Sequence, residues 1–382
     1  MTVVAHPAVS SARALARPSG RRTPLFLGLL GIVVVLCLVG LVMVMSASSV
    51  VGLYQFGSSW YFVKRQLIWL VAALAVLMVT MRIDYRSWRR VSAPLLFGSI
   101  IALGLVLVPG IGVSVYGATR WLGAGPIQIQ PSEFAKLGLV LFIADLLSRR
   151  AHRLDDLRVT LKPVLIVSGL VFVLLLLQPN LGTTLVAGAI VASMLFVAGV
   201  PLLPLGAVGA VAVAGAGILA VAAPYRRARV VSYLDPWADP RGDGYQTIQA
   251  LVGIAQGGVA GLGLGASRSK WGFLPFAHTD FVFAIIAEEV GLVGAGAVVL
   301  LLMGLCWLGV ATSLRAPDRF GTLVAAGITT WLAAQAFVNI GAVIGILPIT
   351  GVPLPFVSFG GSSMLSTMAA TGILLNIARH AR

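Results

Sequence analysis

Pro163–Tyr225 reads PVLIVSGLVFVLLLLQPNLGTTLVAGAIVASMLFVAGVPLLPLGAVGAVAVAGAGILAVAAPY and runs for 63 residues without a single Asp, Glu, Lys or Arg. A helix that crosses a bilayer needs about 20 apolar residues. The stretch therefore predicts three spans with tight connections, interrupted near Gln178-Pro179-Asn180 and near Val200-Pro201. We expect a fold made of helices that lie in a membrane.

The whole chain has the composition of a membrane protein. Of its 382 residues, 59% are hydrophobic and 10% are charged, and the mean hydropathy is +1.00. Soluble domains carry about 25% charged residues, so a soluble globule is excluded. Both cysteines, Cys37 and Cys306, lie inside apolar runs, which excludes a disulfide framework and a cysteine-based metal site.

The remaining spans follow from other stretches that carry few charges. Phe320–Ala378 has no charged residue and is long enough for two helices. The other predicted spans are Leu25–Met45, Gln66–Met81, Pro94–Val113, Glu133–Leu147 and Phe281–Thr312. The prediction is an all-α, polytopic integral membrane protein of about ten transmembrane helices, with a long outer loop (224–280) between helices 7 and 8.

The distribution of basic residues predicts the orientation of the chain. Seventeen Lys and Arg residues fall in the N-terminal tail, the segments 82–92, 148–162 and 313–319, and the C-terminus, whereas the opposite short loops carry three. Positive charge favours the cytoplasmic side, so both termini are expected there. We expect residues 1–24 to be a disordered cytoplasmic tail and residues 25–382 to form the membrane domain.

The formal net charge of +15 is explained by this orientation signal and by attraction to anionic membrane lipid. The chain has no module that alternates basic and aromatic residues for nucleic acid, so nucleic acid is not expected as a partner.

Polar residues beside the apolar stretches mark candidate sites, because each needs a partner or a purpose in hydrocarbon. Ser132 can cap the helix that follows it, and Glu133 and Lys136 stand three residues apart on one helix face. One interpretation is an internal ion pair. The other is a cationic site, formed by Arg120 and Lys136, for an anionic lipid headgroup.

Two further polar segments lie at predicted outer turns. Gln178, Asn180 and Thr183 are able to hydrogen-bond across the bundle, which is the usual role of polar residues in membranes. Residues 351–363, GVPLPFVSFGGSS, allow irregular backbone that lines a cavity. Tight helix packing by small residues is the competing interpretation. The candidate residues of this second segment are Ser358, Gly360, Gly361, Ser362 and Ser363.

The end of the long loop places Asp280 directly before an apolar run, with His278 and Thr279 ahead of it. Burial raises the pKa of such a carboxyl and a cation such as Lys270 lowers it, which is how a general base is tuned. Glu288 follows eight residues later. A simpler interpretation makes Asp280 a helix cap.

These segments, in this order, resemble one family, the SEDS group (FtsW, RodA and SpoVE type) of bacterial cell-wall proteins. The matching segments are Gly117–Leu122, Gln130–Glu133 with Lys136, Gln178-Pro179 with Leu181–Thr183, Gly257-Gly258 to Gly265, His278–Phe281 to Glu288-Glu289, and Pro353–Ser363. They span nearly the whole chain outside the tail. The run PLPFVSFGGSS looks closer to the division and sporulation branch than to the elongation branch.

The resemblance implies a peptidoglycan glycosyltransferase in the bacterial cytoplasmic membrane. Such an enzyme polymerises lipid II, an undecaprenyl-diphosphate-linked disaccharide peptide, on the outer leaflet. It is usually paired with a class B penicillin-binding protein and works with divisome or elongation-complex proteins. The family's essential carboxylate falls on Asp280. Two positions depart from the family pattern: Asn180 stands where many members have Asp, and Phe276 replaces a residue that is often acidic or polar.

The chemistry implied by the resemblance inverts an anomeric carbon, since lipid II is α-linked and the glycan is β-1,4-linked. We expect Asp280 to act as the general base, and Arg120, Lys136 and Lys270 to hold the departing diphosphate. A divalent cation (Mg²⁺ or Mn²⁺) could supplement these cations, with Asp280 and Glu288 as its candidate ligands. The predicted substrate-binding residues are Arg120, Gln130, Ser132, Glu133, Lys136, Gln178, Asn180, Thr183, Lys270, His278, Thr279, Glu288, Ser358, Gly360, Gly361, Ser362 and Ser363.

Two other classes of function stay open from the sequence. A transporter that flips lipid II also uses many spans, broken helices and intramembrane carboxylates, although we find no convincing inverted repeat. A noncatalytic scaffold for a penicillin-binding protein would need no general base.

Overall fold

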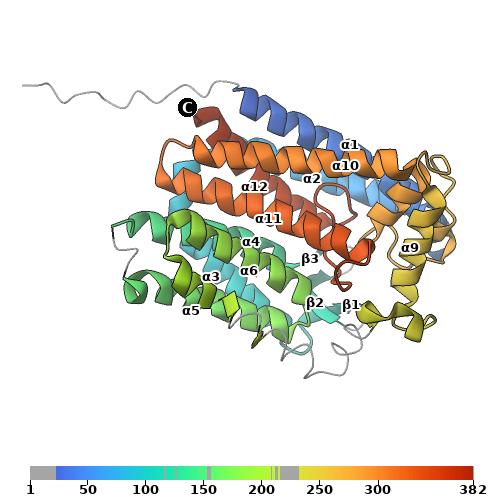
Figure 1. Cartoon of the computed structure of the whole chain (residues 1–382), viewed down its shortest axis with the longest axis horizontal. Helices are drawn as coiled ribbons and strands as arrows, with labels where there is room; N and C mark the ends of the chain where they lie inside the picture. Colours follow the sequence, from blue (N-terminus) through green and yellow to red (C-terminus); the bar gives the residue numbers. More distant parts are fainter. Residues whose placement is uncertain are drawn as a thin grey trace, which may run out of the picture.

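The structure is a computed structural model that describes residues 23–115, 118–124, 127–152, 156–207, 209–210, 214–215 and 232–381. Long helices dominate this part of the chain (Figure 1). They are α1 (Pro24–Phe56), α2 (Tyr61–Arg82), α3 (Trp88–Val106), α4 (Pro131–Arg149), α5 (Leu157–Leu177), α6 (Leu181–Ala198), α10 (Val282–Leu314), α11 (Arg319–Val343) and α12 (Gly361–His380), with the shorter α9 (Tyr245–Gly257).

Seven of the described helices are long and apolar enough to cross a membrane. The helices α4 and α12 are of similar length and pack inside the bundle, where they carry polar side chains. The all-helical, polytopic fold expected from the sequence is confirmed. The predicted breaks at 178–180 and 200–201 fall between helices. The third helix of that stretch lies mostly outside the described residues, as does nearly all of the predicted tail.

The first helix is longer than the predicted Leu25–Met45. Thr23 caps its start by accepting a hydrogen bond from the Phe26 amide, and Pro24 occupies the first helical position, where a missing N–H costs nothing. The helix continues until Gly57, which takes a left-handed conformation (φ 70°). Its 33 residues measure about 50 Å, more than the hydrocarbon thickness.

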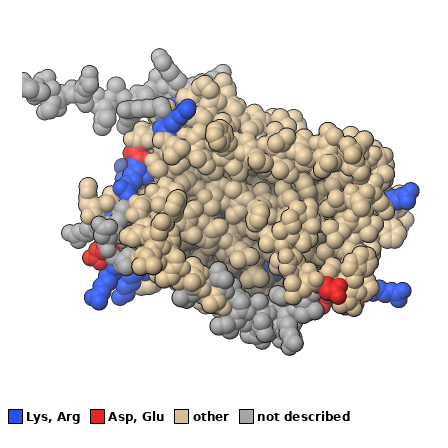
Figure 2. All heavy atoms as spheres, viewed as in Figure 1, with Lys and Arg blue, Asp and Glu red and all other residues tan. Residues whose placement is uncertain are grey.

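The two described chain ends lie at the same end of the molecule, which we call the terminal end (Figure 1). The Thr23 hydroxyl donates to the Ala378 carbonyl at 2.8 Å. Figure 2 shows blue Lys and Arg side chains gathered at this end and a broad, mainly tan surface between the two ends. The opposite end, which we call the loop end, carries α9 and a small sheet. An even number of membrane crossings places both chain ends at the same end of the molecule, as observed here.

A three-stranded antiparallel sheet at the loop end was not expected. Its strands are β1 (Gly112–Val115), β2 (Ala118–Ala124) and β3 (Ile127–Ile129), in the order β1-β2-β3. The prediction of a helix over Pro94–Val113 is therefore wrong at both ends. The helix starts earlier, at Trp88, and ends at Val106, because Pro109 and Gly110 (φ 87°) do not continue it.

The helix α10 is interrupted at Gly291, whose φ of 71° and ψ of −169° are not helical. The break leaves the carbonyls of Glu288 and Glu289 open, and they accept hydrogen bonds from the amides of Leu262 and Gly263 at 3.0 and 2.9 Å. The long loop is thereby fastened to the first part of α10. This attachment fixes the segment that carries Asp280.

Candidate active site

A cavity of about 380 Å³ lies at the loop end, where the sheet, α2, α12 and two loops meet. Its walls combine basic, aromatic and small polar residues with one carboxylate. The lining residues are Arg65, Trp69, Ala118, Arg120, Trp121, Gln128, Gln130, Phe276, Thr279, Asp280, Thr350, Gly351, Pro353, Phe359, Gly360, Gly361 and Ser363.

Asp280 contributes the carboxylate of this cavity. The N-cap of α10 is Phe281, so Asp280 lies one residue before the capping position of the simpler interpretation. A Cβ built on Gly351 would lie 3.5 Å from Asp280 Oδ2 and 3.9 Å from Arg120 Nη1. The acid and the guanidinium therefore approach the same point of the backbone. Glycine at 351, with φ 72°, keeps that point free of a side chain.

Asn339 of α11 holds the backbone of two loops, at Asp280 and at Val352. Its buried amide donates to the carbonyl of Asp280 at 2.7 Å and to that of Val352 at 2.8 Å. Gln335, one helical turn earlier, donates to the carbonyl of Pro353 at 2.9 Å. Two side chains of one rigid helix thus fix the two loops that form the cavity wall.

Strand β2 carries Arg120, and the Gln178-Pro179 turn anchors it. Arg120 Nε donates to the Gln178 carbonyl at 3.1 Å, and Nη2 donates to the Pro179 carbonyl. The side chain of Gln178 itself bonds the Leu103 carbonyl at 2.8 Å. The predicted second polar segment therefore positions the arginine from behind and does not line the cavity.

Arg65 and Trp69 of α2 are cavity residues that the sequence analysis missed. The guanidinium carbon of Arg65 lies 5.7 Å from the centre of the Tyr61 ring, in a cation–π contact. Arg65 Nη1 also donates a hydrogen bond to the Tyr61 hydroxyl at 3.2 Å. Trp69 packs so closely on Gly361 that a Cβ there would lie 2.3 Å from its indole ring. The available signal was Arg65 itself, a cation at the edge of an apolar helix.

The structure places Lys136 away from the cavity. Its ammonium is 1% exposed and lies 2.8 Å from Glu133 Oε1, 2.9 Å from Gln335 Oε1 and 4.7 Å from the centre of the Trp331 ring. The Ser366 hydroxyl completes the group by donating to Glu133 Oε2 at 3.0 Å. The prediction of Lys136 as a diphosphate ligand finds no support, because this ammonium is enclosed by its own bundle partners.

Lys270 and the two glutamates of α10, Glu288 and Glu289, form contacts between the long loop and α10. Lys270 Nζ lies 3.4 Å from Glu289 Oε1, and Glu288 accepts hydrogen bonds at 2.7 Å from both the Ser267 hydroxyl and the Arg268 amide. These contacts hold the loop to α10 and lie outside the cavity lining. Glu288, suggested as a metal ligand together with Asp280, does not line the cavity that contains Asp280. The described residues contain no group of three or more His, Cys, Asp or Glu placed for a metal ion.

His278 packs against two phenylalanine rings and does not line the cavity. Its ring centre is 4.4 Å from that of Phe62 and 5.7 Å from that of Phe359. Burial lowers the pKa of His278 to about 4, because the charged form would lose its hydration. The imidazole is therefore neutral near pH 7, and its backbone carbonyl accepts a hydrogen bond from the Phe359 amide at 3.0 Å.

The structure divides the predicted substrate-binding residues into two groups. One group lines the cavity, and Phe276, which departs from the family pattern, joins it with a left-handed φ of 58°. The other supports the cavity from outside or packs in the bundle. The lining group is Arg120, Gln130, Thr279, Gly360, Gly361 and Ser363, which lie beside the predicted catalytic residue Asp280; the second group is Ser132, Glu133, Lys136, Gln178, Asn180, Thr183, Lys270, His278, Glu288, Ser358 and Ser362.

Hydrogen bonds explain the supporting role of several residues in the second group. The Ser362 hydroxyl accepts from the Gln130 amide at 3.0 Å and so ties the start of α12 to the end of the sheet. The Ser358 hydroxyl accepts from the Leu354 amide at 2.8 Å. Asn180 Nδ2 donates to the Ser132 hydroxyl at 3.5 Å. Each bond shapes a segment from which a cavity residue projects.

Comparison with known proteins agrees over nearly the whole chain. The family model of FtsW, RodA and SpoVE, described as cell cycle protein, matches residues 27–382. Stage V sporulation protein E of Bacillus subtilis is 41% identical over 351 residues, which cover 92% of this chain and 96% of that protein. The probable peptidoglycan glycosyltransferase FtsW of Geobacter metallireducens is 41% identical over 339 residues, covering 88% and 90%.

A solved structure gives the same result for the fold. This structure describes how a peptidoglycan synthase complex coordinates polymerization and crosslinking. The matching chain superposes on the present one with a TM-score of 0.75 at 33% sequence identity. The match covers 92% of this chain and 97% of that one.

Proposed function

Because this chain belongs to the FtsW/RodA/SpoVE family of cell cycle proteins, we propose that it is a peptidoglycan glycosyltransferase that polymerises lipid II. The relatives named above carry names from the division and sporulation branch, which supports a role in division or a related wall-building process. The cavity that contains Asp280 is the active site in this proposal.

The observation that carries the proposal is the meeting of Asp280 and Arg120 at Gly351, with Arg65 in the same cavity. A guanidinium matches the oxygens of a phosphate in a planar, two-pronged geometry. One cavity thus offers a carboxylate for a sugar hydroxyl and two arginines for a diphosphate. Trp69 and Trp121 add apolar surface beside them.

The reaction is a single displacement with inversion. Asp280 takes the proton of the 4-hydroxyl on one saccharide while that oxygen attacks the anomeric carbon of the other. The bond from this carbon to the diphosphate breaks, and the diphosphate leaves with the bonding electrons. Arg120 and Arg65 stabilise its growing negative charge. General-base help contributes about 10²–10⁴-fold and a fixed charge partner about 10²–10³-fold to such rates.

Membrane orientation follows from the basic residues at the terminal end. We propose that both termini are cytoplasmic and that the loop end with its cavity faces the outer leaflet of the bacterial cytoplasmic membrane. The saccharide then reacts outside while its prenyl chain stays in lipid. The partner proposed for this chain is a class B penicillin-binding protein. A divalent cation that accompanies the diphosphate, rather than one held by a protein cage, is compatible with this cavity.

The test is a polymerisation assay with purified protein and lipid II, with and without the candidate penicillin-binding protein. We expect the wild type to make a β-1,4-linked polymer and Asp280→Asn to make none, while that variant still inserts and binds its partner. Asp235→Asn, in an exposed turn of the same loop, is the matched control and should stay active. Headgroup translocation in liposomes without polymer would indicate a transporter instead, and wall synthesis retained by Asp280→Asn would indicate a scaffold.

A further inference from the structure

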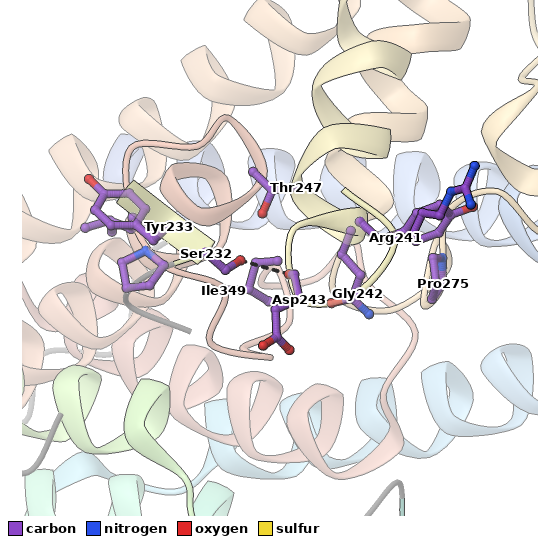
Figure 3. A pocket seen from close by; sticks show the side chains of 12 residues that line it. Ser232, Tyr233, Arg241, Gly242, Asp243, Thr247, Pro275 and Ile349 are labelled. Atoms are coloured by element: carbon purple, nitrogen blue, oxygen red, sulfur yellow. Dashed lines mark hydrogen bonds between the residues drawn. The ribbon is translucent and has the colours of Figure 1, made fainter. Parts of the chain in front are cut away.

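Figure 3 shows a second cavity, of about 330 Å³, which is lined by residues near the start of α9. Its walls come from residues 232–247 at the start of α9, from Pro275, and from the segment 347–349. Figure 3 shows Tyr233 on one side in this view and Arg241 on the other, with Ser232 and Asp243 between them.

The two cavities share a wall made of two chain segments. Pro275 lines the second cavity, and its neighbour Phe276 lines the active-site cavity. In the other segment, Ile349 lines the second cavity and Thr350 lines the first. Successive residues therefore border different cavities, and only the thickness of these segments separates the two spaces.

The backbone around the second cavity is fixed by hydrogen bonds. The Ser232 hydroxyl donates to the Asp243 carbonyl at 2.8 Å, and the Tyr233 hydroxyl donates to the Ile346 carbonyl at 2.7 Å. The Asp239 carboxylate accepts from the amides of Gly242 and Asp243 at 3.0 and 3.3 Å. The rim is thus built before a ligand arrives, which lowers the entropic cost of binding.

Besides Ser232 and Tyr233, the lining has five polar side chains that hold no other part of the described chain. None of the five side chains named next forms a hydrogen bond or ion pair with any residue that the structure describes. They are Arg241, Asp243, Tyr245, Gln246 and Thr247. Thr247 is also buried, with 7% of its surface exposed. Donors, acceptors and aromatic rings are therefore available together in one cavity.

This set of groups fits a saccharide better than the other ligands at hand. Sugar hydroxyls and amides bind carboxylate, guanidinium, amide and hydroxyl groups at once, and their apolar faces pack on tyrosine rings. An anionic diphosphate is disfavoured by Asp243, and a prenyl chain by the polar lining. We propose that the second cavity binds the glycan strand, at a sugar unit next to the one that reacts beside Asp280.

The proposal rests on the proposed function and adds a prediction about product length. A strand held in the second cavity stays near the active site between additions, so each encounter adds several units. The loss of this contact leaves the chemistry of one transfer intact, since the active-site groups are unchanged, but releases the product earlier.

The test measures two quantities on the same samples: the rate of the first transfer between two lipid II molecules, and the mean length of the glycan. The variant is Arg241→Ala with Asp243→Asn, both at exposed positions. We expect a first-transfer rate within about twofold of wild type and a mean strand length at least about threefold shorter. Arg268→Ala, an exposed arginine of the same loop outside both cavities, is the control and should keep the wild-type length.

A binding measurement with a lipid-free β-1,4-linked oligosaccharide of N-acetylated sugars gives an independent arm. We expect the wild type and the Arg268→Ala control to bind it and the double variant to bind it at least about tenfold more weakly. Unchanged strand length and unchanged binding in the double variant would overturn the proposal. That result leaves the proposed function standing, whereas a wild type that makes no first transfer contradicts the proposed function itself.

Discussion

The molecule holds two acid–base pairs that look alike in sequence and differ in the structure. Asp280 and Arg120 meet at the wall of an open cavity, whereas Glu133 and Lys136 form an enclosed pair with Gln335 and Trp331. The first pair lines a cavity, and the second is enclosed by side chains of the bundle. Charge beside an apolar helix therefore marks a site only when space is left in front of it.

The largest expected difference between the two pairs is the loss of polymerisation rate when Arg120 is replaced. We expect Arg120→Ala to lower the rate of lipid II polymerisation by about 10²–10³-fold, because the departing diphosphate loses a fixed charge partner. Arg120→Lys should recover only part of the rate, since an ammonium does not reproduce the two-pronged contact. Polymerisation by equal amounts of folded protein measures both. A fully active Arg120→Ala variant would remove the first pair from the chemistry.

For the buried pair, the effect is on folding rather than on chemistry. We expect Lys136→Met to destabilise the protein by about 3–5 kcal/mol, because it leaves Glu133 as an uncompensated buried charge. The double variant Glu133→Gln with Lys136→Met should regain much of this loss. Thermal unfolding in detergent checks the difference. If Lys136→Met unfolds like wild type but loses turnover, then Lys136 belongs to the active site after all.

An intermediate effect is expected from Asn339, which touches the backbone of the cavity but does not line it. Asn339→Leu removes both bonds to the carbonyls of Asp280 and Val352. We expect the turnover number to fall by about tenfold, since a shift of the base by a fraction of an ångström is enough, while KM changes little. Steady-state kinetics give the two constants separately. An increase in KM alone would point to substrate binding instead of positioning.

The smallest effect concerns His278 and pH. Its folded pKa of about 4 lies below the usual value of 6.5, so the unfolded chain binds more protons between these values. The stabilising contribution is complete above pH 6.5 and is lost as the pH falls toward 4. We expect the unfolding temperature of wild type to drop more between pH 7 and pH 4.5 than that of His278→Gln. Equal drops would show that folding does not lower the pKa of this imidazole.

The sequence was sufficient for the helical fold, and it singled out Asp280 and Arg120, which the structure places in one cavity. Runs without charge define spans because hydrocarbon excludes charge, and the resemblance supplied the order of the motifs. The sheet over 112–129 was missed, since its short strands carry no repeated pattern that differs from loop. Lys136 and Lys270 were assigned to the diphosphate because spacing along the chain does not reveal which carboxylate lies across the bundle. Arg65 was missed because the order of residues along the chain does not show that α2 borders the same cavity as β2.

Chemical rescue of Asp280→Ala tests the role of this carboxylate most directly. The rate of a single transfer between lipid II molecules is measured with and without added formate, whose carboxylate is small enough for the space left in the cavity. We expect the rate of Asp280→Ala to lie at least about 10²-fold below that of wild type and to rise with formate concentration, and we expect no rise for Arg120→Ala. A transfer rate of Asp280→Ala equal to that of wild type, without formate, would contradict this role.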